Sequence, residues 1–186
     1  MYSTIDIWTI SLVEERPVLL SADEAERAAR FRFESDRVRW ARARSALRSI
    51  LAGYRGEAPE ALRFTYGEHG KPLLTGIEFN LSHAGDFAVI AVTETVPVGI
   101  DIERIRPDID IRKLLARLGE TDLPESVHEL YARWTRREAR TKAVGGQLFV
   151  TPVDEIRAVD IEAPAGYSAS VAARGFIPAV NYRGTQ

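Results

Sequence analysis

The chain alternates between two hydrophobic periods, one of two residues and one of three to four. Alternation of apolar and polar residues, which is typical of strands, occurs over residues 5–12, 77–83, 87–93, 98–103, 155–162, 166–173 and 176–182. Apolar residues recur at helical spacing over residues 21–31, 36–53, 110–118 and 125–144. Ser21 followed by Glu24 is a capping-box pattern that predicts the start of the first helix, and Gly53 is the expected end of the second.

These elements follow the order strand, helices, strands, and the order then repeats once. The pattern predicts an α+β fold, and it suggests two similar halves, residues 1–97 and 98–186, that meet near Pro97 and form one compact unit. No low-complexity linker separates the halves, and they share no obvious sequence repeat. The predicted duplication therefore depends on the order of the elements.

Composition narrows the class of protein. The 186 residues are 45% hydrophobic and 28% charged, as in an ordinary soluble globular chain. A formal net charge of −2 argues against a general nucleic-acid-binding protein, which is usually basic. The absence of cysteine excludes disulfides, thiolate nucleophiles and cysteine-type zinc sites. Because neither a signal peptide nor a membrane-spanning apolar run is found, we expect a cytoplasmic protein with no membrane partner.

Two acids stand among aliphatic residues in VGIDIERIRP, residues 98–107. Residues two apart on a strand share a face, so Asp101 and Glu103 project together while Ile100 and Ile102 face the core. Two carboxylates on one face are a partial ligand set for Mg²⁺, which completes its shell with water and substrate phosphates. The alternative, which this pattern alone favours, is an edge strand with a solvated polar face.

A second group lies on the helix predicted over residues 125–144. Leu130, Trp134, Glu138 and Lys142 recur every four residues and therefore form one stripe. A buried Trp134 would direct Glu138 and Lys142 inward, where a carboxylate and a cation beside Mg²⁺ are suited to phosphoryl transfer. The alternative is a surface ion pair between Glu138 and Lys142, which is common on helices.

Further polar groups lie around the predicted hairpin. Lys71 is at the tip of a turn, and Asn80, Ser82 and His83 follow at a strand end. These donors are suited to a phosphate, with turn capping and a polar core as the alternative. Neighbours on a strand point to opposite faces, so Ser82 and His83 are not a catalytic dyad.

The helix over residues 36–53 is rich in arginine. The five arginines are Arg37, Arg39, Arg42, Arg44 and Arg48. Such a helix can face water, bind a multiply phosphorylated small molecule or bind DNA, and the negative overall charge makes DNA the weakest of these alternatives. Taken together, the acids, Lys142 and the scattered cations indicate one polyanionic ligand bound with a divalent cation.

In this order and spacing, four segments resemble the signature of the surfactin-type 4′-phosphopantetheinyl transferases. They are GKP at 70–72, NLSHAGD at 80–86, VGIDIERI at 98–105 and WTRREARTKAVGG at 134–146. The resemblance implies a pseudo-twofold pair of similar α/β subdomains with the active site between them. It also implies transfer of the phosphopantetheine arm of coenzyme A to a serine of an apo acyl or peptidyl carrier protein, with release of 3′,5′-ADP.

The resemblance also implies roles for individual residues. Asp101, Glu103 and Glu138 would hold Mg²⁺, and Glu138 would also be the base for the carrier serine. Lys142 would neutralise charge on the leaving group. Coenzyme A contacts are implied for Arg39, Lys71, Ser82 and His83. A monomer is expected, without a nucleic-acid partner.

Some positions depart from the family pattern. Glu24 stands where a lysine is common, and Arg27 is the expected substitute for a neighbouring lysine of the family. Ala84 replaces a hydroxyl residue, and Arg137 replaces a lysine. A role for Glu120 as a further acid stays open. The alternatives to transfer are a non-catalytic coenzyme A or nucleotide binder on the same fold, a nucleic-acid-binding module and a metal-dependent pyrophosphate hydrolase.

Overall fold

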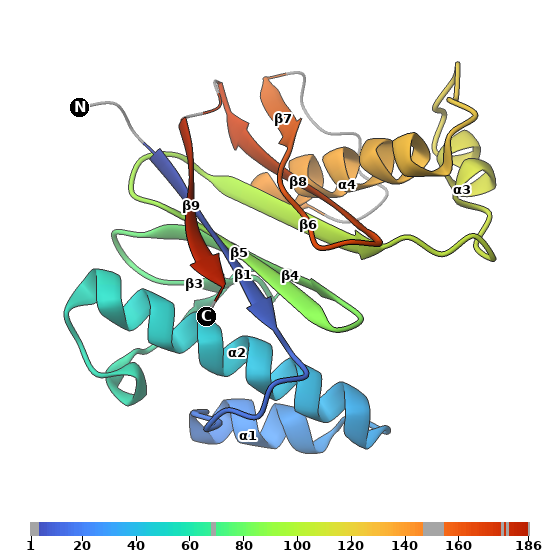
Figure 1. Ribbon diagram of the computed structural model, residues 1–186. Helices are drawn as coiled ribbons and strands as arrows, with labels where there is room; N and C mark the ends of the chain where they lie inside the picture. The colour runs from blue at the N-terminus through green and yellow to red at the C-terminus, as the bar shows by residue number, and fades with distance from the viewer. Residues whose placement is uncertain (1–3, 68–69, 147–154, 176, 178, 186) are drawn as a thin grey trace.

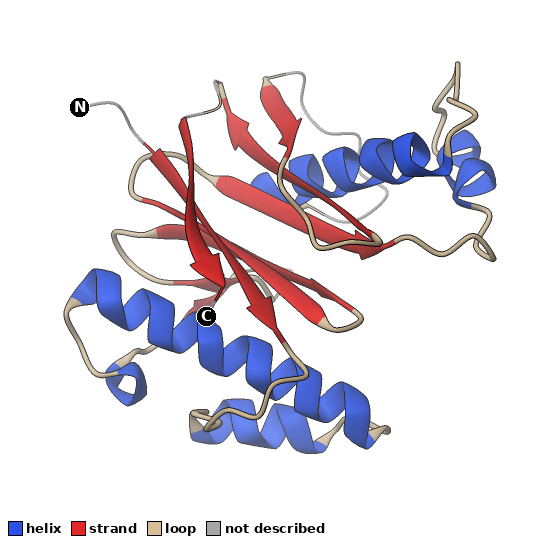
Figure 2. Ribbon diagram, viewed as in Figure 1, coloured by secondary structure: helices blue, strands red, loops and turns tan. Residues whose placement is uncertain are grey.

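The chain folds into four stacked layers, in which two sheets lie between two helices (Figures 1 and 2). A computed structural model describes residues 4–67, 70–146, 155–175, 177 and 179–185. The elements before residue 97 are β1 (Thr4–Ser11), α1 (Ala22–Ala29), α2 (Glu34–Arg55), the short 3-10 helix Pro59–Ala61, β2 (Thr65–Tyr66), β3 (Pro72–Leu73), β4 (Glu78–Ala84) and β5 (Phe87–Thr93). The elements after it are β6 (Val98–Arg104), α3 (Ile111–Arg117), α4 (Val127–Ala143), β7 (Ile156–Asp160), β8 (Tyr167–Arg174) and β9 (Ala179–Thr185).

The first sheet has the strand order β4-β5-β1-β9, and α2 covers one of its faces. The pairs β4/β5 and β1/β5 are antiparallel, whereas β9 is parallel to β1. The apolar side of α2 packs on the sheet through a core that includes Ile10, Leu47, Leu51 and Ile90, each at most 1% exposed. Burial of these aliphatic side chains is the main force that holds α2 in place.

The second sheet has the strand order β6-β8-β7, and different layers cover its two faces. α4 packs on one face. The other face meets the first sheet in a shared core that includes Ile7, Val89, Ile100 and Val171, each at most 1% exposed. Apolar burial between the sheets therefore joins the two parts of the chain.

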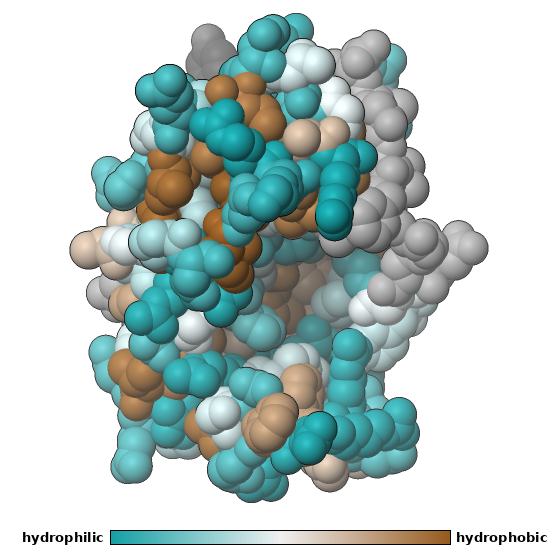
Figure 3. Space-filling model, turned by 90° about the vertical axis from the view of Figure 1, so that its right-hand side faces the viewer, coloured by the Kyte–Doolittle hydropathy of each residue, from teal (hydrophilic) through white to brown (hydrophobic). Residues whose placement is uncertain are grey.

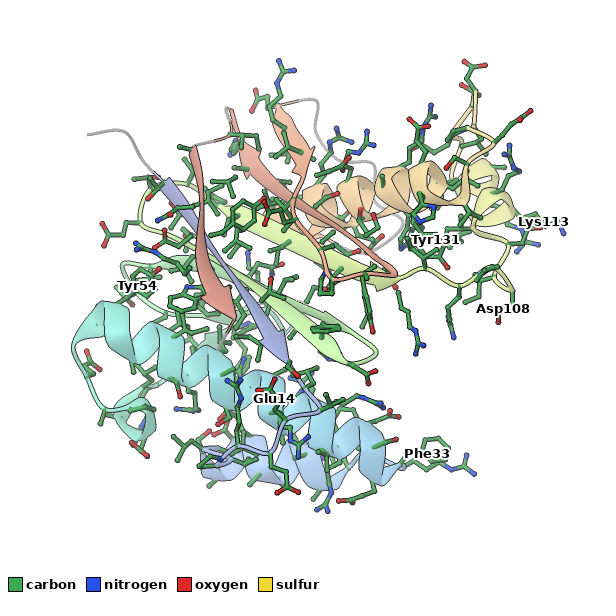
Figure 4. All side chains as sticks on the ribbon, in the orientation of Figure 1. Glu14, Phe33, Tyr54, Asp108, Lys113 and Tyr131 are labelled. Atoms are coloured by element: carbon green, nitrogen blue, oxygen red, sulfur yellow. The ribbon has the colours of Figure 1, made fainter. Side chains whose placement is uncertain are left out.

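The last strand returns to the first sheet. β9 lies beside β1, where the Asp6 carboxylate accepts hydrogen bonds from Asn181 Nδ2 at 3.0 Å and from the Tyr54 hydroxyl. Arg183 is 2.9 Å from the same carboxylate. Figure 4 shows Tyr54 on the end of α2, pointing toward these strands. Residues 179–185 follow the second sheet in sequence, yet they complete the first one.

The predicted elements agree with the structure within a few residues. The Ser21 N–H donates to the Glu24 carboxylate at 2.9 Å, so α1 begins where the capping pattern predicts. The prediction that α2 ends at Gly53 is wrong, because the helix continues to Arg55. Gly56 ends it in the left-handed conformation, with φ of 64° and its N–H bonded to the Ala52 carbonyl.

Two details lie outside these predictions. The two-residue pair of β2 and β3 was not expected from the alternation pattern. Phe176 and Pro178, in the last predicted strand, lie outside the described residues. None of the helices in the described part of the chain has the length and apolar character that crossing a bilayer requires.

Candidate active site

The candidate site forms where β6 passes under α4. Along β6, Ile100 and Ile102 point into the core between the sheets, while Asp101 contacts Ser82 and Lys142 and Glu103 meets Trp134. The alternation predicted from sequence is therefore present. Asp101 is only 3% exposed, so the alternative of a solvated edge strand does not hold for this residue.

The close approach of β6 and α4 depends on Gly99. A Cβ atom at this position would lie 2.1 Å from the carbonyl oxygen of Ala139 and 2.3 Å from the backbone nitrogen of Ala143. No side chain fits in this space, because both neighbours are backbone atoms. Gly99 thus lets the helix lie directly on the strand that carries the acids.

Lys142, near the end of α4, links the two sheets. Its Nζ lies 2.6 Å from Asp101 Oδ1 and 2.9 Å from the Ser82 hydroxyl. The Ser82 hydroxyl in turn donates to Asp101 Oδ1 at 3.0 Å. A strand of the first sheet, a strand of the second sheet and α4 therefore meet at one carboxylate. Lys142 pairs with Asp101, which differs from the surface pair with Glu138 that its helix spacing allowed.

Two carboxylate oxygens at this junction have no partner among the described residues. They are Asp101 Oδ2 and Glu138 Oε1, and both are buried. The Glu103 carboxylate lies alongside and accepts a hydrogen bond from Trp134 Nε1 at 3.4 Å. A buried carboxylate oxygen without a donor is costly, so such atoms commonly mark a site for a ligand or metal.

The protein environment raises the pKa of all three acids. For Asp101 the main cause is burial, which outweighs the opposing charge of Lys142. For Glu103 the causes are burial and the negative charge of Asp101. For Glu138, burial and the charges of Asp101 and Glu103 raise the pKa to about 7. Three crowded carboxylates of this kind need an added positive charge to stay ionised together.

The acids of this junction suit a divalent cation whose shell is completed by other ligands. No three His, Asp or Glu side chains in the described ranges converge closely enough to enclose a metal by themselves. Mg²⁺ needs only one or two protein carboxylates, because water and substrate phosphates complete its shell. The two unpartnered oxygens of Asp101 and Glu138 are hard ligands of the required kind, so the donor set fits.

A cavity of about 290 Å³ reaches the junction at Lys142. Residues from both parts of the chain line it, among them Trp40, Lys71, His83, Lys142 and Gly146. Figure 3 shows the molecular surface hollowed between the side that carries α3 and the side that carries α1 and α2. A second cavity of about 590 Å³ continues along α1 and shares Arg27 and Gly70 with the first.

The basic groups of the cavity occupy different settings. Lys71 is half-buried, and burial lowers the pKa of its amino group. His83 lies at the rim, where loss of water contacts and the charge of Lys142 lower the pKa of its ring. Arg39 is not among the lining residues and instead pairs with Asp86 at 2.9 Å. The structure thus gathers Lys71, His83 and Lys142 around one cavity, with Arg39 outside it.

The structure explains the departures from the family pattern at Glu24 and Arg137. Glu24 is 1% exposed, and its carboxylate is held by Arg44 and by Arg48, whose Nε lies at 2.5 Å. It therefore occupies the interior between α1 and α2, while Arg27 faces both cavities. Arg137 pairs with Glu120 at 3.3 Å beside the site.

Sequence reasoning did not single out two residues of this site as positioning groups. Asn80 accepts a hydrogen bond from the backbone N–H of Ile100 at 2.9 Å, so it ties β4 to β6. Gly99 lies against the backbone of α4 at Ala139 and Ala143. A glycine within an otherwise aliphatic strand was the available signal for a close approach of another backbone.

Comparison with known proteins identifies the class. Residues 13–95 match a family model described as the N-terminal part of 4′-phosphopantetheinyl transferase. The transferase HetI of Nostoc sp. is 36% identical over 162 residues, which cover 76% of this chain and 68% of HetI. A 4′-phosphopantetheinyl transferase of Bacillus subtilis is 30% identical over 165 residues, which cover 80% of this chain and 73% of that protein.

A shorter match connects the chain with a third relative. The transferase AcpT of Escherichia coli O157:H7 is 38% identical over 122 residues, which cover 59% of each chain. The chain thus spans less than two thirds of AcpT and somewhat more of the other two relatives. On these matches, the chain belongs to the 4′-phosphopantetheinyl transferase family, and the transferase class predicted from its motifs is confirmed.

Proposed function

We propose that this chain transfers the 4′-phosphopantetheine moiety of coenzyme A to a serine of an apo acyl or peptidyl carrier protein, with release of 3′,5′-ADP, in a Mg²⁺-dependent reaction. The observation that carries the proposal is the junction of Asp101, Glu138 and Lys142 beside a cavity, with a buried, unpartnered oxygen on each acid. The signature segments favour the surfactin-type branch of the family.

In the proposed reaction the serine oxygen attacks the phosphorus that bears the pantetheine arm. A new P–O bond forms to serine, and the bond from that phosphorus to the bridging oxygen of the diphosphate breaks. Both electrons of the broken bond remain on the phosphate of 3′,5′-ADP. The serine proton passes to the carboxylate of Glu138, which acts as the general base.

The other residues act by charge and position. Lys142 lies at the cavity wall, where its ammonium stabilises the negative charge that develops on the bridging oxygen. Ser82 and Asp101 hold that ammonium through contacts of 2.9 and 2.6 Å. Bound Mg²⁺, held by Asp101 and Glu138 with Glu103 alongside, would neutralise charge on the diphosphate. His83, at the rim of the same cavity, supplies a hydrogen-bond donor for the phosphates of coenzyme A.

We also propose that the two halves are related by a pseudo-twofold axis, with 1–97 and 98–186 as their ranges. Similar strand orders support this. In the first half β5 lies between β4 and β1, and in the second β8 lies between β7 and β6, with antiparallel pairing throughout. In both halves a long helix packs on the sheet. Residues 179–185 are the exception, because β9 joins the first sheet.

We also propose that the protein acts as a monomer in the cytoplasm. All residues of the candidate site come from one chain, so the chemistry needs no second copy. A chain without cysteine is compatible with a reducing compartment.

The test is the mass of a panel of apo carrier proteins after incubation with the enzyme, coenzyme A and Mg²⁺. We expect at least one carrier to gain one phosphopantetheine. Unchanged masses across several unrelated carriers would contradict the proposal. Release of 3′,5′-ADP without a carrier would instead indicate hydrolysis.

The alternative function is a non-catalytic coenzyme A or nucleotide binder on the same fold. The observation that favours it is that no three acidic or histidine side chains in the described part of the chain enclose a metal unaided. It predicts calorimetric binding of coenzyme A without any change in carrier mass. The carrier assay therefore separates the two functions.

A further inference from the structure

The free edge of β6 is buried, although no strand among the described residues pairs with it there. In the second sheet β6 is the outermost strand, and within the described part of the chain its ladder is with β8. Its other edge faces β4 of the first sheet. Val98 and Ile100 are both 0% exposed, so water cannot satisfy the backbone groups on that edge. Buried backbone groups need partners, and here side chains supply them.

Two side chains of the first half perform this role. Asn80 Oδ1 accepts the hydrogen bond from the Ile100 N–H at 2.9 Å, within the protein interior. Lys71 Nζ donates to the Val98 carbonyl at 3.2 Å. The same Nζ donates to the Lys142 carbonyl at 3.4 Å, at the C-terminal end of α4. A cation is favourable at this end of a helix, which carries partial negative charge.

We propose that Asn80 and Lys71 are positioning residues that clamp the edge of β6 and the end of α4 to the first half of the chain. These contacts lie on either side of Gly99, where β6 and α4 approach each other closely. They keep Asp101 and Lys142 within hydrogen-bonding distance of Ser82, which belongs to the first sheet. The resemblance to the family implies a coenzyme A contact for Lys71. In the structure the Lys71 ammonium instead donates hydrogen bonds to the backbone carbonyls of Val98 and Lys142.

The clamp itself is independent of the proposed reaction, whereas its kinetic effect rests on that reaction. Displacement of a catalytic group by about 1 Å can reduce the rate by about a hundredfold. The clamp therefore controls turnover. Lys142 contacts both Asp101 and Ser82 only when the distance between the two sheets is maintained.

Amide hydrogen exchange followed by NMR on the free enzyme tests the Asn80 contact without any reaction. In Asn80→Leu the Ile100 N–H loses its acceptor, and we expect its exchange to accelerate about tenfold to a hundredfold. The matched control is Asn181→Leu, which removes an asparagine bound to Asp6 at the far edge of the first sheet and leaves Ile100 exchange unchanged. Unchanged Ile100 exchange in folded Asn80→Leu would overturn the clamp.

Steady-state kinetics with coenzyme A and with 3′-dephospho-coenzyme A test the role of Lys71. These measurements also test the clamp if Asn80→Leu does not fold. Lys71→Met keeps the apolar stem and removes the cation. If Lys71 is a clamp, kcat falls about tenfold or more and the ratio of kcat/KM for coenzyme A to that for 3′-dephospho-coenzyme A stays constant. If Lys71 instead binds the 3′-phosphate, KM for coenzyme A rises and the ratio collapses, which overturns its positioning role.

Rescue gives a further distinction. Lys71→Arg retains donors for both carbonyls and should recover most of the kcat lost in Lys71→Met. If the kcat of Lys71→Arg is as low as that of Lys71→Met, Lys71 is not a positioning residue. If the wild-type enzyme modifies no carrier, the proposed reaction fails, while the exchange of the Ile100 amide still decides the clamp.

Discussion

Gly99 on β6 lies directly under the carbonyl oxygen of Ala139 on α4, at a distance that leaves no room for a Cβ atom. A methyl group there would be 2.1 Å from that oxygen. In Gly99→Ala the helix must move away from the strand, so we expect a loss of about 1–3 kcal/mol in the free energy of unfolding. The same movement lengthens the 2.6 Å contact of Lys142 with Asp101 and reduces transfer. Urea unfolding and the carrier assay measure the two effects.

The matched control for this prediction is Gly53→Ala. A Cβ atom at Gly53 meets nothing within 4 Å, and the residue lies inside α2. Alanine is the better helix former, so this variant should gain about 0.5–1 kcal/mol. If both variants changed stability by the same amount, the crowding at Gly99 would not be the cause.

Glu138→Gln tests the proposed base. Glutamine keeps the shape of the side chain and removes its ability to accept a proton, so we expect kcat to fall about 10²–10⁴-fold. Circular dichroism and the melting temperature should stay near those of the wild type. Glu129→Gln, an exposed acid on the first turn of the same helix, should retain full activity. Wild-type turnover in Glu138→Gln would remove this residue from the reaction.

Lys142→Ala tests charge neutralisation at the leaving group. Loss of the ammonium should reduce kcat about 10²-fold or more, because no other cation contacts Asp101 Oδ1 in the described structure. Arg133→Ala is a suitable control, since this residue of the same helix bonds only to the Thr121 carbonyl among the described contacts. Equal rates in the two variants would show that Lys142 has no part in transfer.

The sequence predicts the elements of this fold better than it predicts their contacts. Alternation places Ile100 and Ile102 in the core and Asp101 on the opposite face, because strand geometry determines which side chains share a face. The alternation along β6 cannot predict that Asp101 is buried, because its burial depends on α4 lying over the strand. That arrangement joins segments about forty residues apart, as the Lys142–Asp101 contact shows.

The arginine-rich helix α2 is a second case in which the sequence pattern does not predict the contacts of the side chains. Charge patterning favours a solvated or ligand-binding face for Arg44 and Arg48, yet both are buried against Glu24. Their partner lies on another helix, 20 and 24 residues away in the chain. Periodicity within one helix contains no information about such a pairing.

Mg²⁺ should stabilise the folded protein even without substrate. The ion would bind the carboxylates of the folded state, and at a hundredfold excess over Kd it should add about 2.7 kcal/mol to the free energy of unfolding. Glu103→Gln should diminish this gain. Asp108→Asn is the control, since Figure 4 shows Asp108 at the outer end of the molecule, near Lys113 and away from the junction. Identical Mg²⁺ shifts in all three proteins would argue against the proposed metal site.

The Glu24 cluster should make the protein sensitive to acid. Burial alone would raise the pKa of Glu24, but hydrogen bonds from Arg48, the Ser21 N–H and Arg44 outweigh it and lower the pKa below the usual 4.5. The ionised form is therefore favoured in the folded state. Its contribution to stability is complete above the unfolded pKa and disappears as the pH falls through the folded pKa.

Glu24→Gln tests this cluster directly. The substitution leaves two buried guanidinium groups without a countercharge, so we expect a loss of about 3–5 kcal/mol at neutral pH, measured by urea unfolding. Because the titrating group is absent, the loss of stability between neutral and acidic pH should be smaller than in the wild type. Glu26→Gln on the same helix removes an exposed pair with Arg30 and should leave the urea midpoint nearly unchanged. If Glu24→Gln matched Glu26→Gln at neutral pH, the buried pairing would contribute little to the free energy of unfolding.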